Sequence, residues 1–214
     1  MRAQVSLLVA LAALSAGCGG DEPSSTDVQA ATACSEADVP QPEERDAERP
    51  AQALDGATTY VLTFRTNCGV FAVTLDQAKA PKTAASLVSL ARAGYFDGTI
   101  FHRIVPGFVI QGGDPTQSGA GGPGYSTRDV PPTGMQYTKG AVAMAKAAAE
   151  PPGTAGSQFF VVTGADAGLP PEYAAVGTVT SGLDVVEQIG LLGDPATEEP
   201  TEPVVVERVT VSER

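Results

Sequence analysis

A short stretch of this sequence, FHRIVPGFVIQGGD at residues 101–114, combines strand-like apolar residues with side chains that could do chemistry. It contains Arg103, Gln111 and the only histidine of the chain, His102. An arginine is always charged, and a strand built only for a core does not normally contain one. Because side chains alternate along a strand, Arg103 and His102 face opposite sides. The stretch therefore predicts a strand whose arginine is directed at something other than the core.

A second stretch, GSQFFVVT at residues 156–163, has the same character. On a strand, Gln158, Phe160 and Val162 share one face, and the opposite face is also apolar. In a barrel, both faces of a strand are apolar only where something binds on the outside. If the two stretches lie side by side, they form an apolar groove lined by phenylalanines. An arginine and a glutamine then supply two hydrogen-bonding groups in this groove.

The segments around these stretches predict a mainly β domain. Residues 60–66 and 69–75 are apolar and β-branched and predict a hairpin. A helix is expected to begin at Pro81 and to end before Gly94, because apolar residues recur between them at helical spacing. Further strands are expected at 99–105, 108–112, 140–145, 158–163, 175–180 and 204–211, and a second helix at 183–189. About eight strands and two helices predict a closed eight-stranded antiparallel barrel capped by two helices.

The charge of the chain is unevenly distributed. The formal net charge of the 214 residues is −12, with ten acids and two bases at 19–55 and six acids and no base at 184–202. Residues 56–181 contain seven acids and eight bases. The acidity therefore belongs to the flanking segments more than to a binding surface, which argues against nucleic acid as the main partner.

The first residues, MRAQVSLLVALAALSAGC, are typical of an exported protein. The apolar run at 5–16 would rise about 18 Å as a helix, which is too short for a bilayer core of about 30 Å. Residues 1–17 are therefore expected to be a signal peptide. The small residues before Cys18 resemble the signal of bacterial lipoproteins. This resemblance implies a lipid on Cys18 that holds the protein at the outer face of the cell membrane or in the cell envelope; the alternative is an ordinary signal peptide with an incidental cysteine.

Residues 18–56 are polar, acidic and poor in large apolar groups, which predicts a flexible tether. Two cysteines remain after Cys18, namely Cys34 in this tether and Cys68 in the turn of the expected hairpin. Exported proteins meet oxidising conditions, so a Cys34–Cys68 disulfide is expected, with two free thiols as the alternative. Residues 57–214 are then the folded domain.

The stretches FHRIVPGFVIQGGD and GSQFFVVT, with GYFDGTIFHRI before them and VGTVTSGLDVVEQI after them, resemble the cyclophilin-type peptidyl-prolyl cis-trans isomerases. The resemblance extends over residues 60–211. It implies an eight-stranded antiparallel barrel with two helices, and an enzyme that rotates X–Pro peptide bonds in polypeptide clients. With the lipoprotein signal it implies an isomerase that assists the folding of exported proteins. We expect a monomer that needs no cofactor and no metal ion and does not bind nucleic acid.

The same resemblance assigns roles by position. It implies that Arg103 is the catalytic arginine, that Gln111 orients it, and that Phe108 belongs to the catalytic set. The residues expected to bind substrate are Val109, Ala145, Lys146, Gln158, Phe160, Leu169 and Tyr173. Lys146 stands where an asparagine is familiar, Tyr173 stands where a histidine is familiar, and the loop at 147–156 is longer than usual. These departures concern substrate preference and rate, not the fold.

Several of these residues also have a simpler interpretation. Arg103 alone could form a surface salt bridge, His102 is expected to be a packed and hydrogen-bonded core residue, and Asp114 is expected to anchor a turn. One histidine and two cysteines cannot supply a metal site, and no G-x-S-x-G motif accompanies His102 for a serine hydrolase. The remaining competitor is a lipid-anchored module that binds proline peptides, or acts as a chaperone, with little turnover. Retention of Arg103 and Gln111 favours the enzyme, because binding alone does not require them.

Overall fold

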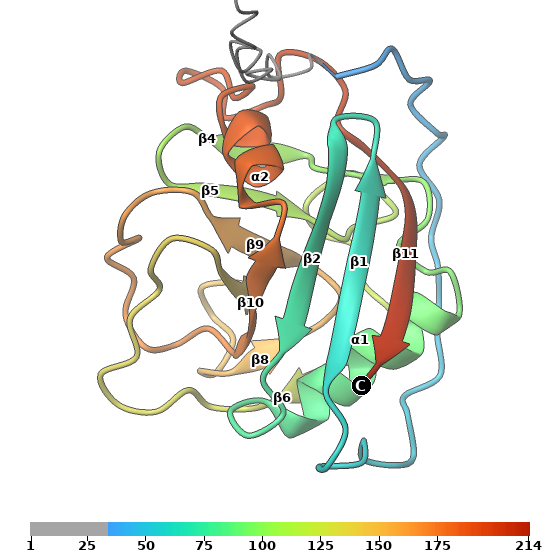
Figure 1. Cartoon of the computed structure of the whole chain (residues 1–214), viewed down its shortest axis with the longest axis vertical. Helices are drawn as coiled ribbons and strands as arrows, with labels where there is room; N and C mark the ends of the chain where they lie inside the picture. The colour runs from blue at the N-terminus through green and yellow to red at the C-terminus, as the bar shows by residue number, and fades with distance from the viewer. Residues whose placement is uncertain (1–33) are drawn as a thin grey trace, which may run out of the picture. The chain divides into compact units, whose positions relative to one another are not determined.

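The computed structural model describes residues 34–214, so the expected signal peptide and Cys18 lie outside the described residues. The fold is mainly β, with two helices (Figure 1). The strands are β1 (Tyr60–Thr66), β2 (Gly69–Leu75), β3 (Thr99–Ile100), β4 (Arg103–Val105), β5 (Val109–Gly112), β6 (Thr127–Arg128), β7 (Ala141–Met144), β8 (Thr154–Ala155), β9 (Phe159–Val162), β10 (Ala175–Ser181) and β11 (Val205–Glu213). The helices are α1 (Pro81–Arg92) and α2 (Leu183–Gly190).

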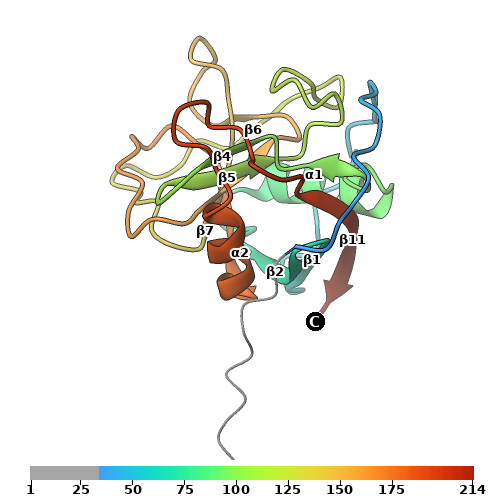
Figure 2. The ribbon, with the colours of Figure 1, turned by 90° about the horizontal axis from the view of Figure 1, so that it is seen from above.

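Nine of the strands form one antiparallel sheet in the order β3-β11-β1-β2-β10-β7-β9-β5-β4, and β6 pairs with β8 in a small second sheet. The sheet curls, so that β4 and β5 lie on one side of the molecule and β1 and β2 on the other (Figure 2). Inside the curl, Phe64 of β1 stacks on its cross-strand partner Phe71 of β2, with ring centroids 4.8 Å apart. Helices α1 and α2 lie at opposite ends of the sheet (Figure 1).

The expectation of a closed eight-stranded barrel is not confirmed, because the sheet has nine strands and stays open between β3 and β4. The single strand expected at 99–105 is interrupted at Phe101 and His102. There the chain crosses from one edge of the sheet to the other. Phe101 is fully buried, and its N–H donates to the carbonyl of Val204. Since β3 pairs with β11 and β4 pairs with β5, the two edge strands are neighbours in the chain without pairing with each other.

Residues 34–56 contain no helix or strand, yet they follow the surface of the domain (Figure 1). The structure contains the expected disulfide between Cys34 and Cys68. Beyond it, the backbone N–H of Glu43 donates to Pro115 and that of Ala47 donates to Pro123. Residues 34–56 are therefore attached to the domain at several points. This differs from the expectation that they form part of a flexible tether. No helix among the described residues is long and apolar enough to cross a membrane.

Candidate active site

The residues singled out from the sequence lie on neighbouring strands. Strands β4 and β5 pair so that Arg103 is opposite Gln111, and β5 and β9 pair so that Gln111 is opposite Phe160. Residues that are directly opposite in an antiparallel pair point to the same face of the sheet. The local alternation of each strand and the register of the sheet therefore bring these three side chains together on its outer face.

A pocket of about 310 Å³ opens on this face. It is lined by Arg103, Phe108, Val109, Gln111, Ala145, Lys146, Phe160, Leu169 and Tyr173. Nine of the ten residues expected to act on substrate thus surround one pocket. The tenth, Gln158, lines a neighbouring hollow of about 670 Å³ that shares Gln111, Ala145 and Lys146 with the pocket. The side of the pocket formed by Val109 and Phe160 is apolar and buried.

A chain of hydrogen bonds crosses the pocket and continues along its edge. Arg103 Nη1 donates to Gln111 Oε1 at 3.4 Å, and Gln111 Nε2 donates to Gln158 Oε1 at 3.1 Å. Gln158 Nε2 in turn donates to the carbonyl of Gly121 at 2.9 Å. Each glutamine can use its oxygen for one neighbour and its amide for the next, which fixes the orientation of both side chains.

Comparison with known proteins identifies the family. The model of the family described as cyclophilin type peptidyl-prolyl cis-trans isomerase/CLD matches residues 61–211. The chain belongs to this family. It is 38% identical over 172 residues to peptidyl-prolyl cis-trans isomerase A of Mycobacterium tuberculosis, covering 72% of this chain and 93% of that protein. It is also 38% identical over 147 residues to a peptidyl-prolyl cis-trans isomerase of Schizosaccharomyces pombe, covering 67% and 93%.

Solved structures agree with this assignment. The fold matches a crystal structure of a cyclophilin type peptidyl-prolyl cis-trans isomerase of Cryptosporidium parvum with a TM-score of 0.66 and 28% sequence identity. The match covers 73% of this chain and 99% of that one. A second crystal structure of the same protein, obtained in the presence of the dipeptide Ala-Pro, matches with a TM-score of 0.65 and 28% identity and covers 72% and 99%. The predicted enzyme class is thereby confirmed.

Glu198 is a member of the site that the sequence analysis missed. Its Oε2 accepts a hydrogen bond from Arg103 Nε at 2.7 Å, and its own carbonyl accepts the N–H of Ile104 at 2.8 Å. Glu198 has a φ of +61°, a conformation that is costly for a residue other than glycine. Arg103 is therefore both a pocket residue and the partner in a salt bridge. The only indication of Glu198 in the sequence was the acidic segment at 184–202, which was interpreted as a segment outside the binding surface.

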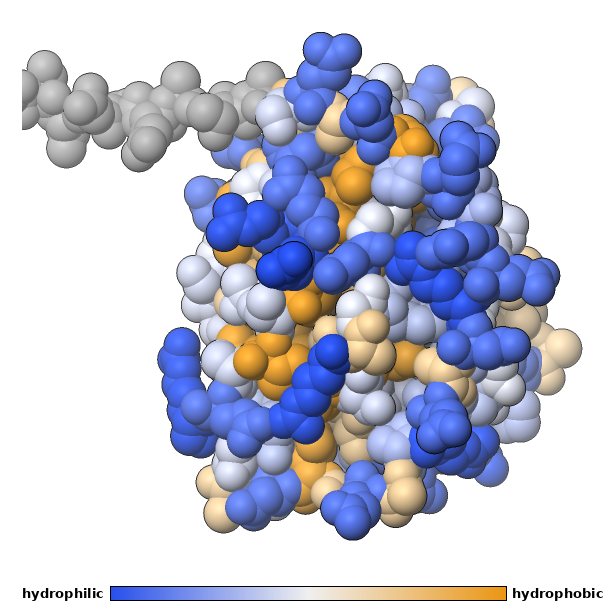
Figure 3. All heavy atoms as spheres, turned by 90° about the vertical axis from the view of Figure 1, so that its right-hand side faces the viewer, coloured by the Kyte–Doolittle hydropathy of each residue, from blue (hydrophilic) through white to orange (hydrophobic). Residues whose placement is uncertain are grey.

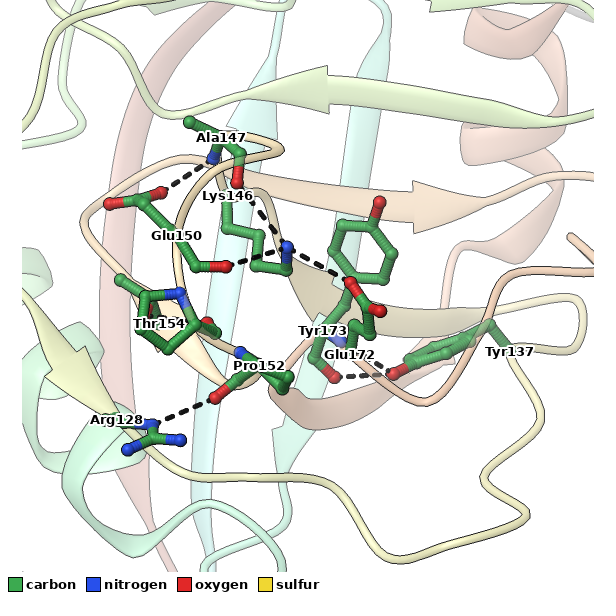
Figure 4. Close-up of polar contacts among 10 residues, drawn as sticks. Arg128, Tyr137, Lys146, Ala147, Glu150, Pro152, Thr154, Glu172 and Tyr173 are labelled. Carbon is green, nitrogen blue, oxygen red and sulfur yellow. Dashed lines mark hydrogen bonds and ion pairs between the residues drawn. The ribbon is translucent and has the colours of Figure 1, made fainter.

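Lys146 lines the pocket, and its side chain also makes contacts that the sequence did not indicate. Its side chain is only 3% exposed, and its Nζ lies 3.2 Å from Glu172 Oε2 and 3.2 Å from the carbonyl of Glu150 (Figure 4). The ammonium also lies 5.6 Å from the centre of the Tyr173 ring. The cation thus joins the loop after β7 to the loop before β10, and these loops form two sides of the pocket.

Tyr173 is held by a second tyrosine that the sequence analysis did not select. Tyr137 Oη donates to the carbonyl of Tyr173 at 2.6 Å and accepts its N–H at 3.0 Å (Figure 4). The Tyr173 ring meets Phe160 edge to face, with centroids 5.5 Å apart. Burial raises the pKa of the fully buried Tyr137, so its hydroxyl stays protonated and can act as both donor and acceptor.

Asp114 anchors a glycine-rich loop at residues 119–124, which borders the site. Its carboxylate accepts hydrogen bonds from the N–H groups of Thr116, Gly119 and Gly121 at 2.8, 2.7 and 3.1 Å. Burial alone would raise the pKa of Asp114, but the hydrogen bonds outweigh it and lower the pKa. A side chain at Gly121 would collide with this carboxylate. The expected turn-anchoring role is confirmed, and through Gly121 this turn is connected to Gln158.

His102 lies in the break between β3 and β4, so the strand alternation that was expected to place it opposite Arg103 does not apply to it. It is half-buried rather than a core residue, and its two ring nitrogens are buried without a hydrogen-bond partner among residues 34–214, which corrects the expectation of a packed and hydrogen-bonded core histidine. Burial lowers the pKa of His102; Asp114 opposes this shift and the charge of Arg103 adds to it. Within the described residues, no group of three His, Cys, Asp or Glu side chains is placed to hold a metal ion.

Proposed function

We propose that the pocket catalyses cis–trans isomerisation of X–Pro bonds in exported proteins, and that a lipid on Cys18 holds the enzyme in the cell envelope. The observation that carries the catalytic part is the placement of the Arg103 guanidinium at the edge of a pocket walled by Val109 and Phe160. A proline ring fits such an apolar pocket. The peptide bond before it would then lie against the guanidinium.

The chemistry needs no group to be transferred. Rotation about a peptide bond faces a barrier of ~18–20 kcal/mol because amide resonance must be broken. In the twisted transition state the proline nitrogen becomes pyramidal and gains a lone pair. A guanidinium N–H aimed at that nitrogen binds the twisted form better than the planar ground state, which is the condition for catalysis.

The remaining pocket residues prepare Arg103 for this task. Glu198 and Gln111 each take one of its N–H groups, so the guanidinium plane is fixed while other N–H groups stay available. Phe108 closes the pocket from the turn between β4 and β5, and Leu169 closes it from the loop after β9. Exclusion of water by these apolar groups strengthens the hydrogen bond to the substrate.

The proposed place in the envelope has two kinds of support. The first is the sequence around Cys18, which resembles a lipoprotein signal. The second is the Cys34–Cys68 disulfide, since stable disulfides form in oxidising compartments. Clients would then be exported polypeptides whose folding is slowed by X–Pro bonds, which isomerise without a catalyst in tens to hundreds of seconds.

The catalytic proposal is tested by measuring cis–trans exchange of an X–Pro peptide by NMR. Arg103→Ala should lower kcat/KM about a hundredfold or more while the chain stays folded. Arg65→Ala is the matched control, because Arg65 is an exposed strand arginine outside the pocket and its loss should leave the rate unchanged. Peptide binding without any acceleration by the wild type would identify a binding module instead.

The proposed anchor is tested by fractionation of expressing cells. The wild-type chain should appear in membranes with an acylated Cys18, and Cys18→Ser should release it.

The proposal about the client class is tested separately. The enzyme is added to an exported protein whose refolding has a slow phase caused by a non-native X–Pro isomer, and that phase should become faster. In the fractionation experiment, a wild-type chain that is wholly soluble with an unmodified Cys18 would contradict the proposed lipid anchor. It would not affect the assignment of the enzyme class.

A further inference from the structure

The N-terminal segment at residues 43–49 lies beside the active site and is held there from both sides. Arg45 Nη1 donates to the carbonyls of Tyr95 and Asp97 at 2.6 and 2.8 Å. On the other side, the N–H of Ala47 donates to Pro123 at 3.0 Å, within the glycine-rich loop. The guanidinium of Arg49 lies 5.5 Å from the centre of the Tyr125 ring. The segment is thus built onto the domain.

This segment forms one wall of the hollow that continues from the proline pocket. The hollow, of about 670 Å³, is lined by the glycine-rich loop at 119–124, by residues 145–147 and by residues 156–158. Glu44, Arg45 and Asp46 of the N-terminal segment complete the lining. Because the hollow and the pocket share Gln111 and Ala145, a polypeptide with its proline in the pocket has room to place a neighbouring residue in the hollow.

The wall presents carboxylates to the hollow. The guanidinium of Arg45 is bound to the carbonyls of Tyr95 and Asp97, and both Glu44 and Asp46 line the hollow. Asp46 Oδ1 lies 2.7 Å from the place a Cβ would take at Gly124, which is another residue of the lining. Among the residues that the structure describes, neither Glu44 nor Asp46 forms an ion pair.

The two cations that line the hollow are already engaged. Arg45 is paired with Glu43 and bonded to the two carbonyls, and the buried ammonium of Lys146 is paired with Glu172. The carboxylate of Glu150, across the hollow, accepts the N–H of Ala147. The uncompensated charge of the hollow is therefore negative. The face along which the segment runs is dominated by hydrophilic side chains, with apolar patches between them (Figure 3).

We propose that residues 43–49 are a specificity element of the enzyme and that Glu44 and Asp46 select clients with a lysine or arginine near the proline. The proposal rests on the function proposed above, since it concerns the polypeptide that occupies the same groove. A basic side chain that entered the hollow would place its cation beside carboxylates that form no ion pair within the part of the chain that the structure describes. The disulfide and the hydrogen bonds to Pro115 and Pro123 hold this wall in place.

The test compares peptides with one X–Pro bond that differ in a single nearby residue, which is lysine, methionine or glutamate. This residue is scanned through the three positions on each side of the proline, and kcat/KM is measured on the full chain. At one position the lysine peptide should exceed the glutamate peptide about threefold to tenfold, because exposed charge pairs contribute modestly. The ratio should shrink with added salt.

Variants assign the preference to the segment. Glu44→Gln/Asp46→Asn should bring the lysine-to-glutamate ratio close to one. Glu36→Gln/Asp38→Asn removes the same charge from exposed residues that precede this segment and do not line the hollow, and it should keep the wild-type ratio. A wild type that turns over all three peptides equally, or a double variant with an unchanged ratio, would overturn the inference. Failure to turn over even the methionine peptide would instead overturn the proposed function.

Discussion

The Nε of Arg103 donates to the carboxylate of Glu198 at 2.7 Å across a sequence separation of 95 residues. This contact leaves the ends of the guanidinium directed toward Gln111 and the pocket. The loop that carries Glu198 is tied to the same strand by the hydrogen bond from Ile104. Glu198 is thus a positioning residue, which would act on the reaction only through Arg103.

Removal of this carboxylate should slow the reaction more than it weakens peptide binding. We expect Glu198→Ala to lower kcat roughly tenfold to a hundredfold, since a hydrogen bond to a charged group contributes about 1.5–3 kcal/mol. KM should change little, because the apolar pocket is untouched. Glu198→Gln, which keeps an acceptor oxygen, should recover part of the loss. NMR exchange measurements over a range of peptide concentrations separate the two parameters.

Two comparisons make this prediction specific. Glu199→Ala removes an exposed neighbouring acid and should have no effect on kcat. In an Arg103→Ala background, Glu198→Ala should cause no further loss, because its partner is already absent. An equal additional loss in that background would show that Glu198 acts independently of Arg103.

Lys146→Met should destabilise the protein and loosen the pocket. Methionine preserves the packing of the methylene groups but leaves Glu172 and the Glu150 carbonyl without the buried ammonium. We expect a loss of about 1–3 kcal/mol in the free energy of unfolding, with a raised KM. Arg128→Met is the control, since Arg128 donates to Pro152 of the same loop from an exposed position and should matter by no more than about 0.5 kcal/mol. Urea denaturation measures both, and equal effects would contradict the role of burial.

The Cys34–Cys68 bond should contribute substantially to stability. It closes a loop with a sequence separation of 34. On the chain-entropy model, a loop of this length predicts about 3–4 kcal/mol. In a Cys18→Ser background, urea unfolding is compared for the oxidised chain and for Cys34→Ala/Cys68→Ala. Reductant should lower the midpoint of the first and leave the second unchanged; a midpoint of the oxidised chain that reductant does not move would refute the contribution.

The stability of the fold should fall when the solution is mildly acidified. Burial holds the pKa of His102 below its ordinary value, so the unfolded chain binds a proton that the folded chain does not. The free energy of unfolding should therefore decrease as pH falls below about 6.5, by at most about 1.4 kcal/mol per pH unit. The lowered pKa of Asp114 acts separately, below about pH 4. His102→Gln should remove the first dependence in urea titrations from about pH 8 to 5, and an unchanged slope would argue against it.

Helices and strands that depend on the local sequence pattern could be predicted from the sequence. The hairpin of β1 and β2 follows from apolar β-branched runs on either side of Asn67 and Cys68, and its bounds agree with the prediction. The break at Phe101 and His102 could not be predicted in this way. It depends on pairing of the flanking strands with β11 and β5, which lie in different parts of the chain.

The pocket was predicted from family motifs, whereas the contacts around it were not. Glu198 lies far from Arg103 in the sequence, and nothing in its own neighbourhood indicates the pairing. Residues 43–49 were expected to be flexible because they lack apolar groups to bury. They dock instead through backbone hydrogen bonds and the Arg45 side chain, and the disulfide at Cys34 fixes the chain shortly before them. Backbone groups are available for such bonds in any sequence.

If Cys18 carries the proposed lipid, the disulfide also limits how far from a membrane the enzyme works. Cys34 would then be the first residue covalently fixed to the domain, and the 15 residues between the two cysteines would let it reach at most about 55 Å from the lipid. Without any attachment before residue 57, the chain from Cys18 to residue 57 would reach about 135 Å. The bond would thus confine the groove to a thin layer above the lipid, where only chains emerging close to that surface could be served.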